Sequence, residues 1–218
     1  MQNVSIKGFI YAALSSATFG LAPFFTISLL LAGFSSFEVL AYRWGIASLA
    51  LVVFGIMLGE TFRISRKDWG TVFILSLLRA ATSFSLVIAY QNIASGVAST
   101  IHFMYPVLTT LIMMIFFRER KSTWRFFAIA LAVVGVSCLS YGDSSGGITA
   151  LGLFIVLLSA LGYALYLVTV SQLKIGHMKG LRLTFYVFLF GTLLLLAGIG
   201  TTTGIQTIPD WHTGGNLV

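Results

Sequence analysis

The chain has 218 residues, of which 58% are hydrophobic and only 9% are charged. A soluble domain carries roughly 25% charged residues because its surface must face water. With 13 basic and 6 acidic side chains, this sequence does not cover a water-facing surface of that size. The composition excludes an ordinary soluble protein and predicts an all-α, integral membrane protein.

Seven apolar runs are long enough to cross a bilayer, whose hydrocarbon core requires about 20 residues of helix. They cover residues 8–31, 36–58, 69–90, 95–117, 124–141, 150–172 and 181–203. The first run is too long for the apolar core of a signal peptide, and no small-residue cleavage site follows it. We therefore predict a polytopic membrane helix bundle of seven transmembrane helices.

The basic residues indicate how these spans are oriented. Eleven of the 13 Lys and Arg residues lie at Lys7, in the loop 59–68, and in the connections that follow the fourth and sixth runs. The alternate loops and the tail after Gly204 hold none. Because positive residues resist translocation, we expect the N-terminus in the cytoplasm and, as the chain stands, the C-terminus outside. Charges confined to short loops provide no basic face, so nucleic acid is not an expected partner.

The residues support neither another class of seven-span protein nor an enzyme. A seven-helix receptor would have its N-terminus outside, and a retinal protein needs a lysine in its last helix, which the run 181–203 lacks. The chain has no H-E-x-x-H, no nucleophile elbow and no phosphate-binding glycine loop. The sequence thus predicts a protein that is not an enzyme and that holds no cofactor and no metal.

A weak internal repeat relates the two ends of the chain. At an offset of 144 residues, Ser15 aligns with Ser159, Phe19 with Tyr163 and Tyr42 with Tyr186. Because five spans separate the two copies, the second copy would enter the membrane upside down, as in the inverted repeats of secondary transporters. This predicts a five-helix inverted repeat with an incomplete second copy: residues 1–142 form the first copy, and residues 143–218 form two helices and a tail.

The fourth-run segment Ala98–Pro106, Arg43 in the second run, and the stretch Phe116–Arg120 carry a family resemblance. With these features the sequence resembles the EamA-type ten-span carriers of the drug/metabolite transporter superfamily. The resemblance implies a membrane carrier for a small molecule. It also implies that the sequence is truncated after seven of ten spans, because the family completes its cavity with three more.

Arg79 is the principal candidate for a substrate contact. It lies ten residues into its run, roughly 15 Å deep at 1.5 Å per residue, where an ionisable group is costly. Ser83 and Tyr90 lie near the same face of the helix, at i+4 and i+11. Arg79 either anchors an anionic group of a substrate or bonds to backbone carbonyls of neighbouring helices. Arg43, nearer the outer end, is interpreted as a structural intramembrane residue.

The fourth run supplies a second group of candidates, His102, Tyr105 and Pro106. Proline removes a backbone hydrogen bond and frees the carbonyl of His102, which is tolerated where protein or a water-lined cavity satisfies it. A cavity near the midplane is one interpretation, and a histidine bonded between helices is the other.

Aromatic and hydroxyl side chains on two further runs complete the predicted substrate pathway: Ser15, Phe19, Tyr163 and Tyr166. They either line a pocket for an amphipathic solute or pack the bundle.

The sequence as a whole predicts a secondary transporter for efflux or exchange of a small metabolite by alternating access, in the cytoplasmic membrane. Its expected partners are the lipid bilayer and a small substrate of anionic or amphipathic character. The alternative is a truncated, inactive or regulatory membrane fragment of such a carrier.

Overall fold

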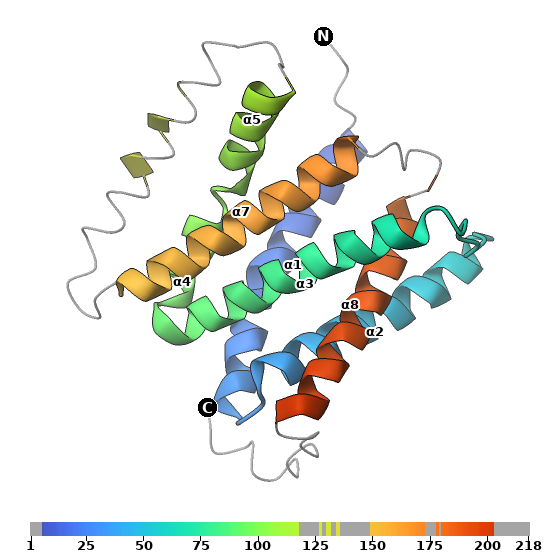
Figure 1. Ribbon diagram of the computed structural model, residues 1–218, viewed down its shortest axis with the longest axis horizontal. Coiled ribbons are helices and arrows are strands. Elements are labelled where there is room, and N and C mark those ends of the chain that lie inside the picture. Colours follow the sequence, from blue (N-terminus) through green and yellow to red (C-terminus); the bar gives the residue numbers. More distant parts are fainter. Residues whose placement is uncertain are drawn as a thin grey trace.

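The computed structural model describes residues 6–117, 127, 130, 131, 134, 135, 149–172, 178 and 180–202. Every regular element in these residues is an α-helix (Figure 1). The helices are α1 (Ile6–Leu31), α2 (Ser36–Met57), α3 (Trp69–Asn92), α4 (Ser95–His102), α5 (Tyr105–Phe116), α7 (Ala150–Gln172) and α8 (Gly180–Thr202). The predicted all-α class is confirmed for this part of the chain.

Five helical segments are long and apolar enough to cross a membrane: Ser36–Met57, Trp69–Asn92, Ser95–Phe116, Ala150–Gln172 and Gly180–Gly200. They match the second, third, fourth, sixth and seventh predicted runs, so the protein is a multi-pass membrane protein. Helix α1 follows the first run, but its described apolar stretch, Leu21–Leu31, is shorter than a span. Most of the predicted span 124–141 lies outside the described residues. The count of seven spans and the inverted repeat stay predictions.

The distribution of polar and apolar side chains is that of a protein surrounded by lipid. Long apolar side chains point outward, with Ile46 67% and Phe154 65% exposed. Several polar side chains are instead buried between the helices: Thr26, Glu38, Ser48, Ser76, Thr82, His102 and Ser159. A hydrocarbon environment accepts the outward Leu, Ile and Phe but penalises unpaired polar groups. The helices therefore turn their polar faces toward one another.

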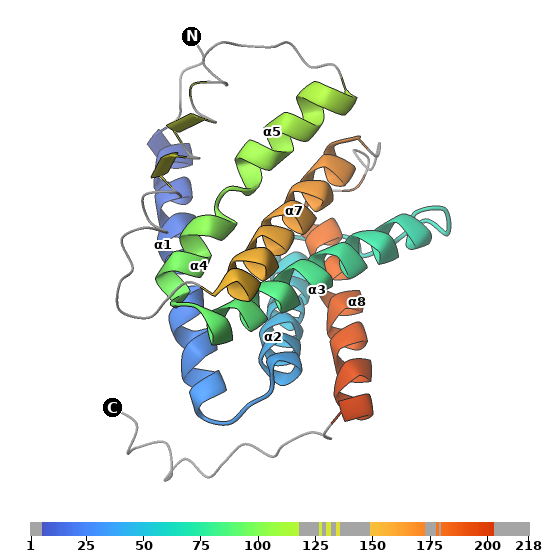
Figure 2. The same cartoon turned by 60° about the vertical axis from the view of Figure 1, so that its left-hand side comes forward.

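Helix α3 lies at the centre of the bundle. It packs along α7 and across α8, while α2 and α8 lie side by side (Figures 1 and 2). Helices α4 and α5 flank α7, and α1 contacts α2 and α4 at the edge of the bundle. Helices from the beginning of the chain thus pair with helices from its end.

At the seam between α2 and α8, where the two helices pack together, a large aromatic side chain of α2 lies opposite a glycine of α8. The Trp44 ring of α2 stacks on Phe188 of α8 with 5.3 Å between centroids, and it lies against buried Gly191. Phe37 lies in the same way against Gly198. Without a Cβ on α8 at these two positions, the two helices approach closely, as small residues permit in membranes.

The loop that joins α2 to α3 is tied to the start of α8. The Tyr186 hydroxyl donates to the Phe62 carbonyl at 2.7 Å, and Arg182 donates to the Arg63 carbonyl and to Thr61 Oγ1, both at 3.2 Å. The Phe62 ring also packs edge-on against Phe185, with 4.9 Å between centroids. The loop therefore belongs with α8 in space, although it precedes that helix by more than 100 residues.

The fourth span is divided into two helices. Helix α4 ends at His102 and α5 begins at Tyr105, with Phe103 and Met104 between them. Pro106 lies in the first turn of α5, where its missing N–H and fixed φ are tolerated. The run 95–117 is therefore a membrane span, but it is not one continuous helix. The proline produces the break that its position in the sequence predicts.

The Trp44–Gly191 contact gives a test of the seam. In Gly191→Ala, a Cβ would overlap the Trp44 ring, and we expect a loss of about 1–3 kcal/mol in the free energy of unfolding. Gly200→Ala is the matched control on the same helix, since a Cβ there meets nothing within 4 Å. Titration with SDS in detergent micelles measures both variants. Equal stability of the two would contradict the close approach of α2 and α8.

Candidate functional site

Polar side chains from several helices converge on a small buried cavity of about 40 Å³. Its walls come from α1, α2, α3 and α4, and its polar lining residues are Arg43, Arg79, Thr82, Ser83, Tyr90 and His102. Such a volume holds about one water molecule, whereas ligand pockets measure roughly 300–1,000 Å³. The cavity in this structure is therefore smaller than a ligand pocket, and we call its polar lining residues the polar centre.

Arg79 lies within this centre on α3, as its depth in the third span predicts. One guanidinium nitrogen donates to Ser83 Oγ at 3.4 Å, one helical turn along. The guanidinium carbon lies 4.5 Å from the centre of the Tyr163 ring and 6.0 Å from that of Trp44. Aromatic faces attract a cation by roughly 2 kcal/mol or more when water is excluded. These rings hold Arg79 in place without neutralising it.

Arg43 reaches the same cavity from α2. Its guanidinium donates to Thr26 Oγ1 of α1 at 3.0 Å, and Thr26 itself is fully buried. Thr26 also donates to the carbonyl of Ala22 in its own helix at 2.7 Å. The interpretation of Arg43 as structural finds support in this bond between α1 and α2. Its place in the cavity wall beside Arg79 shows that it also contributes positive charge to the polar centre.

His102 is held by a buried hydrogen-bond chain. Its Nδ1 lies 3.1 Å from Ser159 Oγ on α7, and the Ser159 hydroxyl donates to the Thr82 carbonyl on α3 at 2.8 Å. The three residues are almost fully buried, at 3%, 0% and 2% exposure. The chain joins α3, α4 and α7, which is what the interpretation of His102 as a histidine bonded between helices predicts. Since His102 also lines the cavity, its two interpretations are compatible.

A group of stacked aromatic rings lies on one side of the polar centre. Tyr105 and Tyr163 meet edge-on with 4.5 Å between centroids, and Tyr163 stacks on Tyr166 at 5.8 Å. The His102 ring stacks on Tyr163 at 5.7 Å. Tyr163 thus touches Arg79, His102 and both other tyrosines. It is the side chain that joins the cationic centre to the aromatic group.

The predicted pathway residues divide into four groups. Arg79, Ser83, Tyr90 and His102 line the cavity, and Tyr105, Tyr163 and Tyr166 form the neighbouring aromatic group. Pro106 is exposed and lies outside the cavity lining, at the start of α5. The side chains of Ser15 and Phe19 lie outside the described residues.

Four residues that line the polar centre or contact it were not among the predicted site residues: Thr26, Trp44, Thr82 and Ser159. Thr82 lies three positions after Arg79, so helical spacing alone would have found it. Ser159 shares a face with Tyr163 one turn away. Thr26 and Trp44 become visible only once α1 and α2 are placed against α3.

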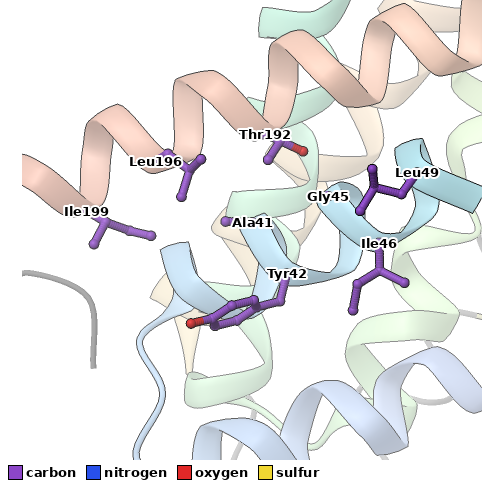
Figure 3. A pocket seen from close by; sticks show the side chains of 8 residues that line it. All are labelled: Ala41, Tyr42, Gly45, Ile46, Leu49, Thr192, Leu196 and Ile199. Carbon is purple, nitrogen blue, oxygen red and sulfur yellow. The ribbon is translucent and has the colours of Figure 1, made fainter. Parts of the chain in front are cut away.

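A second hollow lies on the outside of the bundle between α2 and α8, and it has a different character. Side chains of both helices face into this groove of about 290 Å³ (Figure 3). Its described lining consists of Ala41, Tyr42, Gly45, Ile46, Leu49, Thr192, Leu196 and Ile199, none of them charged. An apolar groove of this kind suits acyl chains or another helix. The charged and hydrogen-bonding side chains lie in the polar centre instead.

Metal ligation has no basis in residues 6–117, 149–172 and 180–202. In these ranges no three His, Cys, Asp or Glu side chains come together in a way that could hold an ion.

Apolar helices that surround a buried, positively charged centre define a multi-pass membrane protein with a polar interior. Residues 6–141 match the EamA-like transporter family, and the chain belongs to it, within the drug/metabolite transporter superfamily. This confirms the resemblance drawn from the fourth span.

Two curated relatives from Bacillus subtilis (strain 168) are similar to the chain. It is 23% identical to the uncharacterized transporter YdfC over 174 residues, which cover 78% of this chain and 56% of YdfC. It is 25% identical to the uncharacterized transporter YojE over 224 residues, covering 97% of this chain and 72% of YojE. The chain therefore spans little more than half the length of YdfC. No solved structure matches it.

The hydrogen bond between Tyr90 of α3 and Ser99 of α4 links these helices at the polar centre, and its contribution to stability can be measured. The two hydroxyls lie 3.1 Å apart. We expect Tyr90→Phe to lower the free energy of unfolding by about 0.6 kcal/mol, the average for interhelical hydrogen bonds in membranes, and by no more than about 1.7 kcal/mol. Tyr42→Phe, in the outer apolar groove, is the control for loss of a tyrosine hydroxyl. SDS titration compares them, and an unchanged Tyr90→Phe protein would show that this bond adds nothing to stability.

Proposed function

We propose that the protein is a secondary transporter that carries a small anionic metabolite through the polar centre. The observation that supports this most is that two guanidinium groups, those of the exposed Arg43 and the half-buried Arg79, line one cavity. The described lining of that cavity contains no acidic side chain. An anion is the ligand that such a site favours.

The electrostatic argument rests on the low dielectric constant of the bundle. Two like charges in a medium of low dielectric constant repel each other much more strongly than they do in water. The rings of Tyr163 and Trp44 offset part of this cost for Arg79, and Thr26 supplies a hydrogen-bond acceptor to Arg43. An anionic ligand would offset the remainder. A carboxylate or phosphate is suited to a guanidinium because two parallel hydrogen bonds can form.

The neighbouring residues have defined roles in this proposal. Arg79 anchors the anionic group, and Ser83 and Tyr105 orient it. The aromatic group of Tyr105, Tyr163 and Tyr166 contacts the rest of the solute. The break between α4 and α5, which Pro106 favours, provides a point at which the fourth span bends.

Transport requires the small cavity to widen alternately toward each side of the membrane. Two inverted repeats that rock against each other about a midplane site provide such a motion in secondary transporters. We propose this arrangement for residues 1–142 and the part of the second repeat in 143–218. The inferred orientation places the N-terminus and the loop 59–68 in the cytoplasm, and a ten-span whole carrier completes the site.

Arg79→Gln tests the anion anchor. The protein is reconstituted in vesicles and assayed for uptake of labelled lactate, succinate, malate and inorganic phosphate. We expect saturable uptake of at least one of these anions, and at least a tenfold loss in Arg79→Gln, because an amide carries no charge. Arg63→Gln, in the exposed loop, is the matched control and should transport normally. Equal uptake by Arg79→Gln and the parent would refute the anchor, and loss of folded protein on gel filtration would indicate a structural role.

The orientation has its own test, which does not depend on the substrate. In a Cys138→Ala background, Ala32→Cys should react with a membrane-impermeant maleimide in intact cells. Ser65→Cys should react only after the cells are permeabilised, because its loop holds three basic residues. The reverse pattern would invert the proposed topology.

A further inference from the structure

The hydrogen-bond chain behind His102 determines which of its ring nitrogens carries the proton. A serine hydroxyl has one hydrogen, and that of Ser159 is donated to the Thr82 carbonyl at 2.8 Å. Toward His102 Nδ1, 3.1 Å away, Ser159 Oγ can therefore act only as an acceptor. Nδ1 must carry a proton to make this bond. In a neutral imidazole, the other nitrogen, Nε2, is then an acceptor.

The surroundings favour the neutral ring. His102 is 3% exposed and lines the same cavity as the guanidinium groups of Arg43 and Arg79. A third positive charge in this cavity would be repelled by the two arginines and would lose its hydration. Nδ1 and Nε2 lie on different edges of the ring. Since Nδ1 faces α7, Nε2 is directed away from Ser159.

A second polar group, Thr82, lies in the cavity wall with its hydroxyl beside Gly162 of α7. Thr82 is 2% exposed, and within the described part of the chain its Oγ1 has no hydrogen-bond partner. A buried hydroxyl without a partner loses hydration that nothing replaces. Thr82 lines the cavity together with His102 and the two arginines. The polar centre therefore combines cationic donors with an imidazole acceptor and an unused hydroxyl.

We infer that Ser159 fixes His102 as a hydrogen-bond acceptor, and that the site selects anions carrying a hydroxyl or other hydrogen-bond donor beside the anionic group. This inference rests on the proposed function, since it assigns a second contact to the ligand that Arg79 anchors. His102 is the specificity-determining residue, and Ser159 is its positioning residue. An anion without such a donor leaves Nε2 unpaired on binding, which costs affinity.

The protonated nitrogen is measured directly by ¹⁵N NMR of the purified full-length chain labelled at histidine. The signals of His102 are assigned by their absence from His102→Phe. We expect protonated Nδ1 and unprotonated Nε2 in the parent protein. Ser159→Ala removes the acceptor of the Nδ1 proton and should shift the ring toward the Nε2-protonated form. Ser171→Ala is the matched control on α7, because that hydroxyl bonds only one turn back, to the Val168 carbonyl at 2.8 Å. Protonated Nε2 in the parent would overturn the inference.

Binding is measured with two pairs of probes that each differ by one hydroxyl, lactate against propionate and malate against succinate. Dissociation constants come from the rise in unfolding temperature with probe concentration. We expect the hydroxylated member of a pair to bind the parent about tenfold more tightly, as one good hydrogen bond allows. The ratio should fall toward one in both Ser159→Ala and His102→Phe, and Ser171→Ala should retain it.

The outcomes separate this inference from the proposed function. Equal binding of both members of each pair, with binding still lost in Arg79→Gln, overturns the role of His102 and leaves the anion carrier standing. If none of the four probes binds the parent, the inference fails, and the anion proposal fails with it only if uptake of inorganic phosphate is absent as well. A preference that survives in Ser159→Ala shows that Ser159 does not position the ring.

Discussion

A guanidinium group cannot face the acyl chains of a bilayer without a large loss of hydration, and two such groups at the centre of this bundle determine how its helices turn. Arg79 directs the polar face of α3 inward, and Arg43 does the same for α2. Thr26, Thr82 and Ser159 are buried between the helices, while Leu, Ile and Phe side chains cover the outside. The central location of α3 follows, because it carries Arg79, Thr82, Ser83 and Tyr90 along one face.

Much of the fold could be predicted from the sequence because hydropathy reports spans directly. The runs 36–58, 69–90, 150–172 and 181–203 agree closely with α2, α3, α7 and α8. The division of the fourth span at residues 103 and 104 was also foreseeable, since proline cannot continue the hydrogen-bond ladder. Which helices pack against each other could not be predicted, because in lipid an apolar helix face fits any other apolar face. Contacts such as Trp44 against Gly191 and Phe37 against Gly198 specify that α2 lies against α8.

The candidate site, too, could be predicted only in part from the sequence. Arg79, His102 and Tyr90 were identifiable because charged and polar residues are rare inside spans, so each is conspicuous. Ser159 was not selected, although it bonds to His102, because a serine within a helix is commonplace and often bonds to its own backbone, as Ser76 does here. Trp44 was not predicted for a similar reason, since an aromatic residue in a span needs no partner. Their roles depend on contacts between residues 35 and 57 positions apart in the sequence.

The tie between the α2–α3 loop and α8 bears on how such a bundle can move. Sliding α8 past this loop would break three hydrogen bonds, to the carbonyls of Phe62 and Arg63 and to Thr61. The same displacement would pull Trp44 out of its place beside Gly191. These contacts hold α2 and α8 together, although the proposed repeats assign the two helices to different copies. A rocking motion of the proposed repeats would leave these contacts intact only if it pivots about the place where α2 and α8 meet.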